Sequence, residues 1–311
     1  MRLLLLGCTG FVGRELVPFL LNLGHQLTLV SRRSRTYAEA PDPRLTHLCC
    51  DPADPASWAQ PALLEALAAA DGVVNLAGEP IADQRWTPSH RQRLLDSRLV
   101  TTRQLVGAMA ALANPPKVLV NGSAVGYYGT SLDACFTEAS PPGDDFLARL
   151  CTGWEAATQV APEACRVVVL RIGIVIGPDG GALAKMLPVF RFGFGGPVGS
   201  GQQWMSWIQR HDLCRLIATA LEDSAYAGPY NAVAPEPVRM ATFASSLGRV
   251  LGRPSLLPVP GPLLQLLLGD GAKVVLEGQQ VKPERLLAQG FHFQYPDLSA
   301  ALAAATSPGR H

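Results

Sequence analysis

The chain has 311 residues, of which 48% are hydrophobic and 16% are charged, and its formal net charge is +1. A chain of this length can bury a large core, and one domain with a smaller lobe is the expected partition. The near-neutral charge argues against nucleic acid and against an anionic membrane as general partners. We expect a small-molecule substrate as partner, or none, and a homodimer stays open.

The seven cysteines form no Cys-x-x-Cys pair. Their odd number, with no recognisable secretory leader, predicts reduced thiols and a cytoplasmic protein. No apolar run reaches transmembrane length, and the apolar stretch 261–269 is far too short. We expect no metal site, because the histidines at 25, 47, 90, 211, 292 and 311 show no ligand spacing.

An apolar run and a glycine-rich turn come first along the chain. Leu3–Leu6 precedes glycines at 7, 10 and 13, and an amphipathic segment follows over 11–23. Gly7 suits a tight turn, Gly10 lets the backbone approach a pyrophosphate, and Gly13 lets the helix pack close to the sheet. We predict a dinucleotide site here, against the alternative that the glycines only shape the turn. The expected contacts are Gly7, Thr9, Gly10, Phe11, Val12 and Gly13.

The second predicted strand, 26–31, ends in the sequence Ser31-Arg32-Arg33-Ser34-Arg35. A carboxylate at this place would repel a 2′-phosphate, whereas a guanidinium binds one through charge-assisted hydrogen bonds. The sequence therefore predicts NADP(H) rather than NAD. Ser31 and Arg32 are the expected phosphate contacts, and Arg33 or Arg35 is expected to stack on adenine or to face solvent. The alternative is a solvated basic loop.

Further apolar and helical segments alternate along the chain. The expected strands are 45–49, 73–76, 118–121 and 167–172, and the expected helices are 61–69, 88–113 and 144–161. This alternation predicts an α/β fold, a Rossmann-like doubly wound parallel sheet with helices on both faces. Ligands bind beyond the carboxyl ends of such strands. The expected cofactor contacts there are Asp51, Leu76, Ala77, Gly78, Ser123 and Gly173.

The regular alternation stops after Gly177-Pro178, and a glycine-rich stretch follows over 192–201. A helix over 211–222 and a strand over 230–233 then return the chain to the sheet. We predict a nucleotide domain over 1–177, completed by about 206–234. The smaller cap, mainly helical, takes 178–205 and 235–302, and 303–311 forms a flexible tail.

These motifs together resemble the extended short-chain dehydrogenase/reductase superfamily. The matching pieces include 9–13, Asp51, 75–78, Ser123 with 127–129, 170–173 and Gly177-Pro178. The chain is most similar to its atypical branch, described as sugar-nucleotide-epimerase-like or cell-division-inhibitor-like. The signatures of that branch match at Ser97-Arg98, 122–129, 145–147, Trp154-Glu155, 180–183 and 203–208, and its short C-terminal domain of unassigned function matches at 276–280 and 290–296.

The resemblance implies catalysis by Ser, Tyr and a Lys four residues after the Tyr, acting on a substrate hydroxyl or carbonyl while hydride moves at the nicotinamide. The corresponding segment, 145–155, contains neither Tyr nor Lys. If Glu155 aligns with the acidic residue of that pattern, Leu147 and Cys151 take the two places. Neither replaces the pair in proton transfer, and Cys151 would do so only as a strongly perturbed thiol.

Ser123 and Tyr127 remain as candidate catalytic residues, with Ser123 orienting an oxygen and Tyr127 or water handling the proton. The alternative is that Tyr127 and Tyr128 are apolar walls. The expected substrate cleft comprises Tyr128, Lys185, Trp204 and Trp207, although packing in a core is the commoner use of tryptophan. Arg171 is expected to pair structurally under the cofactor, and His211 to be a helix cap or a surface residue.

Two functions are therefore predicted. The first is an NADP(H)-dependent oxidoreductase or epimerase that acts on a small hydroxyl- or carbonyl-bearing substrate. The alternative is a catalytically impaired NADP(H)-binding sensor or regulatory protein. The missing Tyr and Lys favour the sensor, while Ser123 and the cleft aromatics favour the enzyme.

Overall fold

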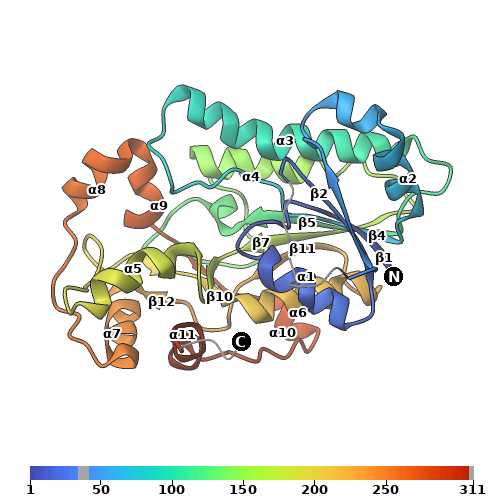
Figure 1. The fold of residues 1–311 in the computed structure, drawn as a ribbon. Coiled ribbons are helices and arrows are strands. Elements are labelled where there is room, and N and C mark those ends of the chain that lie inside the picture. Colours follow the sequence, from blue (N-terminus) through green and yellow to red (C-terminus); the bar gives the residue numbers. More distant parts are fainter. Residues whose placement is uncertain (34–41, 308–311) are drawn as a thin grey trace.

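A seven-stranded parallel sheet forms the centre of the computed structural model, which describes residues 1–33 and 42–307. The strand order is β11-β7-β5-β4-β1-β2-β3, which is the order of a doubly wound nucleotide-binding sheet (Figure 1). The strands are β1 (Arg2–Leu6), β2 (Gln26–Ser31), β3 (Leu45–Cys49), β4 (Gly72–Asn75), β5 (Val118–Ala124), β7 (Arg166–Ile172) and β11 (Gly228–Ala232). The predicted fold class is confirmed.

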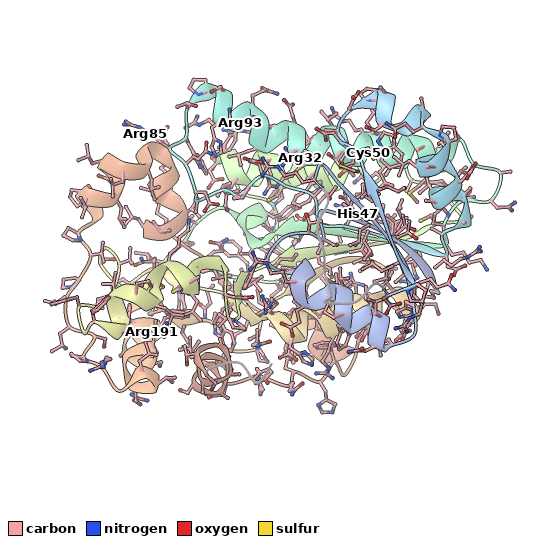
Figure 2. All side chains as sticks on the ribbon, in the orientation of Figure 1. Arg32, His47, Cys50, Arg85, Arg93 and Arg191 are labelled. Carbon is pink, nitrogen blue, oxygen red and sulfur yellow. The ribbon has the colours of Figure 1, made fainter. Side chains whose placement is uncertain are left out.

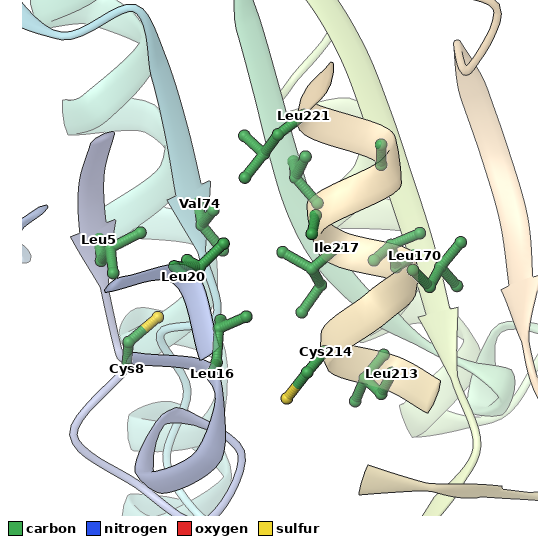
Figure 3. Close-up of a cluster of buried hydrophobic side chains, with 14 of the residues drawn as sticks. Leu5, Cys8, Leu16, Leu20, Val74, Leu170, Leu213, Cys214, Ile217 and Leu221 are labelled. Atoms are coloured by element: carbon green, nitrogen blue, oxygen red, sulfur yellow. The ribbon is translucent and has the colours of Figure 1, made fainter. Parts of the chain in front are cut away.

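Helices cover both faces of this sheet (Figure 1). One face carries α1 (Gly13–Asn22) and α6 (Arg210–Glu222), and the other carries α2 (Pro61–Ala69), α3 (Pro88–Ala110) and α4 (Phe146–Ala156). Leu3 and Leu5 pack in the core under α1 and α6, while Leu4 and Leu6 pack in the core under α2 and α3. Since both faces of β1 are buried, its sequence is a continuous apolar run rather than an alternation of apolar and polar residues. Figure 3 shows part of the first of these cores.

Side-chain caps fix several helix starts. The side chains of Thr87, Asp145 and Gln209 accept the backbone N–H of His90, Ala148 and His211 at the first turns of α3, α4 and α6. The structure shortens three predicted helices, of which α3 ends at Ala110 rather than at residue 113. The chain becomes helical at Gly13 rather than at residue 11, and α4 covers 146–156 rather than 144–161, because Asp145 is its cap and turns follow Ala156.

The smaller cap packs α5 (Gly181–Arg191), α7 (Met240–Leu251) and α11 (Leu298–Thr306) around one core that includes Trp207 and Phe243. The cap also contains β9 (Trp204–Met205), β12 (Val238–Arg239), α8 (Gly261–Leu268), η3 (Gly269–Ala272), α9 (Lys273–Leu276) and α10 (Glu284–Ala288). Two further strands, β8 (Ile174–Ile176) and β10 (Trp207–Gln209), come from the stretches predicted for the nucleotide domain but pair with each other against the core of the cap. The remaining short elements are η1 (Pro55–Ala59), η2 (Val125–Tyr128), β6 (Cys135–Phe136) and β13 (Gln280–Val281).

The start of the predicted flexible tail is wrong. The helix α11 continues to Thr306, and Ala305 is 2% exposed in the core of the cap. Residues 308–311 lie outside the described part of the chain. Within the described part, no helix is both long and apolar enough to cross a bilayer, and no group of three metal-ligating side chains is found there.

Candidate cofactor and catalytic site

The glycine turn after β1 has the conformation that its spacing predicts. Gly7 has φ +72°, and a Cβ on it would lie 2.3 Å from the backbone nitrogen of Ala77. A Cβ on Gly13 would lie 1.7 Å from the carbonyl oxygen of Cys8. At Gly10, by contrast, the nearest atom would be 3.9 Å away. The protein's own packing thus requires Gly7 and Gly13, whereas the space beside Gly10 is open.

Arg210 fixes this turn from the start of α6. Its Nε donates to Glu15 Oε2 at 2.6 Å, and its Nη1 donates to Asp179 Oδ1 at 2.9 Å and to the carbonyl of Phe11 at 3.1 Å. The guanidinium therefore joins α1 and the glycine turn to the segment that leads into the cap. The neighbouring His211 lies 2.9 Å from Glu15 Oε1. It is a half-buried residue of the first turn and not the predicted cap or surface residue, because Gln209 caps this helix.

The end of β2 presents basic side chains. Arg32 leaves 69% of its side chain exposed, and its Nη2 lies 3.8 Å from Glu79 Oε2. Arg33 is exposed as well. The Ser31 hydroxyl is already engaged, because it donates to the carbonyl of Arg33 at 2.6 Å and lies 2.8 Å from His47 Nε2. Figure 2 labels Arg32 and His47 on this side of the sheet. Ser34 and Arg35 lie outside the described residues.

A buried amide shapes the turn after β4. Asn75 donates from Nδ2 to Asn121 Oδ1 at 2.7 Å, and its Oδ1 accepts the backbone N–H of Ala77 at 3.2 Å. This pairing holds 76–78 at the carboxyl edge of the sheet. The neighbouring turns are fixed too, since Asp51 Oδ1 accepts the N–H of Ala53 and a Cβ on Gly173 would lie 2.4 Å from the carbonyl of Ser206.

A buried ion pair lies directly behind Ser123. The Ser123 hydroxyl donates to Glu155 Oε1 at 2.7 Å, and Arg171 binds both oxygens of Glu155 through Nε and Nη2, each at 2.9 Å. The side chains of Arg171 and Glu155 are 4% and 14% exposed. Burial opposes the charge on Arg171, but the hydrogen bonds and charge of Glu155 outweigh it and raise the pKa of Arg171. The predicted structural pairing of Arg171 is confirmed.

The two tyrosines of η2 have different environments. Tyr128 is 3% exposed, and its hydroxyl accepts from Arg171 Nη1 at 2.9 Å and donates to Asn231 Oδ1 at 2.7 Å. Burial raises the pKa of Tyr128 to about 12. Its predicted place in the substrate cleft is wrong, because it belongs to the buried network. The Arg171 guanidinium carbon lies 3.5 Å from the centre of the half-buried Tyr127 ring. Within the described residues, the Tyr127 hydroxyl has no hydrogen-bond partner.

Of the other three predicted cleft residues, one is buried in the core and two reach the surface. Trp207 is 0% exposed and donates to the carbonyl of Glu236, so its assignment to a cleft is wrong and it is a core residue. Trp204 is half-exposed, and the Arg239 guanidinium lies 3.8 Å from its ring centre. The exposed Lys185 donates to Asp83 Oδ1 at 2.5 Å and to the carbonyl of Ala82, which ties α5 to the segment after β4.

Cys151 stands on α4 where the resemblance places a lysine. It is 2% exposed, and burial raises the pKa of its thiol to about 12. The perturbation therefore stabilises the neutral thiol, which is the opposite of what proton transfer near neutral pH needs. Leu147, in the tyrosine place, packs against Gly126.

Comparison with known families agrees with this geometry. A model of the NAD dependent epimerase/dehydratase family matches residues 3–233, and a model described as a domain of unknown function (DUF1731) matches residues 259–305. The chain belongs to the NAD dependent epimerase/dehydratase family. The resemblance inferred from the sequence motifs, including the C-terminal domain of unassigned function, is confirmed.

The relatives place it more closely within that family. It is 41% identical to the human Epimerase family protein SDR39U1 over 97% of this chain and 98% of that protein. It is 44% identical to an Arabidopsis thaliana protein named Epimerase family protein SDR39U1 homolog, chloroplastic, over 96% of this chain and 84% of that protein. A cytoplasmic location for this chain stays a prediction.

Solved structures include one of the human SDR39U1 isoform 2 with NADPH, which is 39% identical and covers 98% of this chain and 99% of that one, with a TM-score of 0.85. A nucleoside-diphosphate sugar epimerase from Corynebacterium glutamicum is 32% identical, has a TM-score of 0.75, and covers 98% of this chain and 58% of that one.

Proposed function

We propose that this chain binds NADP(H) and acts as an oxidoreductase or epimerase on a small hydroxyl- or carbonyl-bearing substrate held against the cap. The observation that carries the proposal is the pairing of an open Gly10 with two exposed arginines, Arg32 and Arg33, at the end of β2. The human relative that is 39% identical was solved with NADPH, which supports the same cofactor for this chain.

The residues present fit this cofactor. The α1 N-terminus offers backbone N–H groups to a diphosphate, and the turn that would hold it comprises Gly7, Thr9, Gly10, Phe11, Val12 and Gly13. Arg32 and Arg33 would bind the 2′-phosphate, with Arg32 leaving Glu79 for the stronger anion. Ser31 would join them only by turning its proton away from the Arg33 carbonyl. The rest of the cofactor would lie along Asp51, Leu76, Ala77, Gly78, Ser123 and Gly173.

The bound cofactor supplies hydride transfer at the nicotinamide. Ser123 would orient the substrate oxygen. Because its proton is given to Glu155, its oxygen is free to accept a hydrogen bond from a substrate hydroxyl. Tyr127 would exchange the proton, with the cation of Arg171 over its ring. Trp204 and Lys185 are the proposed substrate contacts from the cap.

We expect Tyr127→Phe to lower turnover by about two orders of magnitude, because the phenol is then absent while its ring stays in place. The measurement is NADPH oxidation with a broad panel of carbonyl compounds, and calorimetry with NADPH is the control that binding is unchanged. Unchanged turnover in Tyr127→Phe would remove this residue from the mechanism.

The alternative, an NADP(H) sensor, is supported by Leu147 and the neutral Cys151 in the places of the missing pair. The same panel decides between the two functions. Wild-type protein that binds NADPH but oxidises it with no compound would favour the sensor.

Alanine at Gly10 should separate cofactor binding from folding. We expect Gly10→Ala to keep the melting temperature close to wild type and to weaken NADPH binding at least about tenfold, because its Cβ enters the open space. Gly13→Ala should fail to fold or should melt far lower, since its Cβ would overlap the Cys8 carbonyl. Gly107→Ala, within α3 and with open space around its Cβ, is the control, which should leave NADPH affinity unchanged and should not lower the melting temperature. Full NADPH affinity in Gly10→Ala would contradict the proposed diphosphate site.

A further inference from the structure

Arg98, on α3, is a half-buried guanidinium with no carboxylate partner. Within residues 1–33 and 42–307, no Asp or Glu oxygen lies within 4 Å of it, and its partners are neutral oxygens. It donates to the carbonyls of Glu79 at 3.0 Å and Leu94 at 3.2 Å, and lies 3.5 Å from the Ser97 hydroxyl. Burial lowers the pKa of Arg98. The charge of Glu79, which lies beyond salt-bridge distance, offsets this only in part. A cation withdrawn from water without a salt-bridge partner is costly, which indicates that its charge has a use.

The Nε edge of the Arg98 guanidinium makes no hydrogen bond to the described part of the chain. The guanidinium has five N–H donors, and the three hydrogen bonds above come only from Nη1 and Nη2. Within the described chain, Nε donates to no atom. Nε borders the exposed Gly78, where a Cβ would lie 3.1 Å from Nε and 2.8 Å from Cζ. The lack of a side chain at Gly78 therefore leaves this edge of Arg98 open, at the carboxyl end of β4.

The charge of Arg98 lies beside α4, which carries the place of the missing lysine, and Arg98 reaches the end of β2 only through Glu79, whose carboxylate lies 3.8 Å from Arg32. The guanidinium carbon lies 5.2 Å from the ring centre of Trp154, which is on α4. Its positive charge also acts on the thiol of Cys151, in the place of the missing lysine, and the Ser123 hydroxyl contacts that thiol too. The only cation on α4, Arg149, is exposed, so α3 brings a half-buried cation to the region where the family pattern has a lysine.

We propose that Arg98 binds the nicotinamide riboside half of the cofactor, donating from its open edge to ribose oxygens, and that it supplies the positive charge of the missing lysine. The proposal rests on the proposed NADP(H) binding. A guanidinium keeps its proton at all physiological pH values, so Arg98 orients and stabilises oxygen atoms and takes no part in proton exchange.

Two ligands test this assignment by calorimetry. NADPH carries both halves of the cofactor, whereas 2′,5′-ADP carries the phosphorylated adenosine and no nicotinamide riboside. We expect Arg98→Met to weaken NADPH binding at least about tenfold and to change 2′,5′-ADP binding less than about twofold. Arg93→Met is the matched control on the same helix (Figure 2), because Arg93 binds Gln84 and His90 instead, and it should change neither affinity.

Equal losses for the two ligands, or no loss for either, would overturn the role of Arg98. Removing this arginine leaves no buried carboxylate without a partner, so Arg98→Met should fold. If Arg98→Met does not fold, Arg98→Lys is the deciding variant, because it keeps the positive charge and loses the planar set of guanidinium donors. It should weaken NADPH binding less than Arg98→Met does, and it should again leave 2′,5′-ADP binding nearly unchanged. Failure of the proposed function would look different, since the wild-type protein would then bind neither ligand.

Discussion

Arg171→Met should lower the free energy of unfolding by about 3–5 kcal/mol, because it removes one partner of a buried ion pair. This is the largest loss of stability that we expect from a single charge removal in this fold. The substitution leaves the Glu155 carboxylate, 14% exposed, without its two charge-assisted hydrogen bonds. It also removes a donor from Tyr128. Urea denaturation followed by tryptophan fluorescence measures the change.

The double variant Arg171→Met with Glu155→Gln should recover part of that loss, because no uncompensated charge remains buried. The exposed Arg33→Met is the matched control and should change stability by less than about 0.5 kcal/mol. If the double variant were as unstable as the sum of the two single ones, the pair would not act as a coupled buried unit.

Arg32→Ala combined with Arg33→Ala should weaken NADPH binding by about two orders of magnitude and change NADH binding less than about twofold. Only NADPH carries the 2′-phosphate, and charge-assisted hydrogen bonds to it are worth about 1.5–3 kcal/mol each before solvent screening. Calorimetry at one fixed ionic strength is the measurement. The difference should shrink as salt is added.

The control for this double variant is Arg249→Ala with Arg253→Ala, which removes the same charge from exposed positions in the cap. It should leave both affinities unchanged. Equal weakening of NADPH and NADH by the Arg32 and Arg33 substitutions would show that the arginines do not recognise the phosphate.

Much of the sheet could be predicted from the sequence. A strand with both faces buried is an apolar run, and β1 and β2 lie where such runs predict them. The edge strand β3 also lies at its predicted residues, although none of its side chains is fully buried. The helix α2 was predicted over its whole length, because Pro61 marks its first turn. The two-residue strands of the cap were not predicted, since each depends on a partner far along the chain, as β13 does on β6.

The site could be predicted only in part. The roles of Gly7 and Gly13 follow from local spacing, and the structure places them accordingly. The burial of Tyr128 and Trp207 could not be predicted, because an aromatic ring with a polar tip suits a core as well as a cleft. Arg210 was missed because its carboxylate partner Glu15 lies 195 residues away in the sequence. Arg98 was noticed only as part of a family signature, since its lack of a salt-bridge partner among the described residues is visible only in three dimensions.

Calorimetry of the wild-type protein with NADPH and with NADH tests the central claim most directly. Two exposed arginines at the end of β2 and an open diphosphate turn predict binding of NADPH at least about tenfold tighter than NADH. No heat with either nucleotide, or tighter binding of NADH, would contradict it.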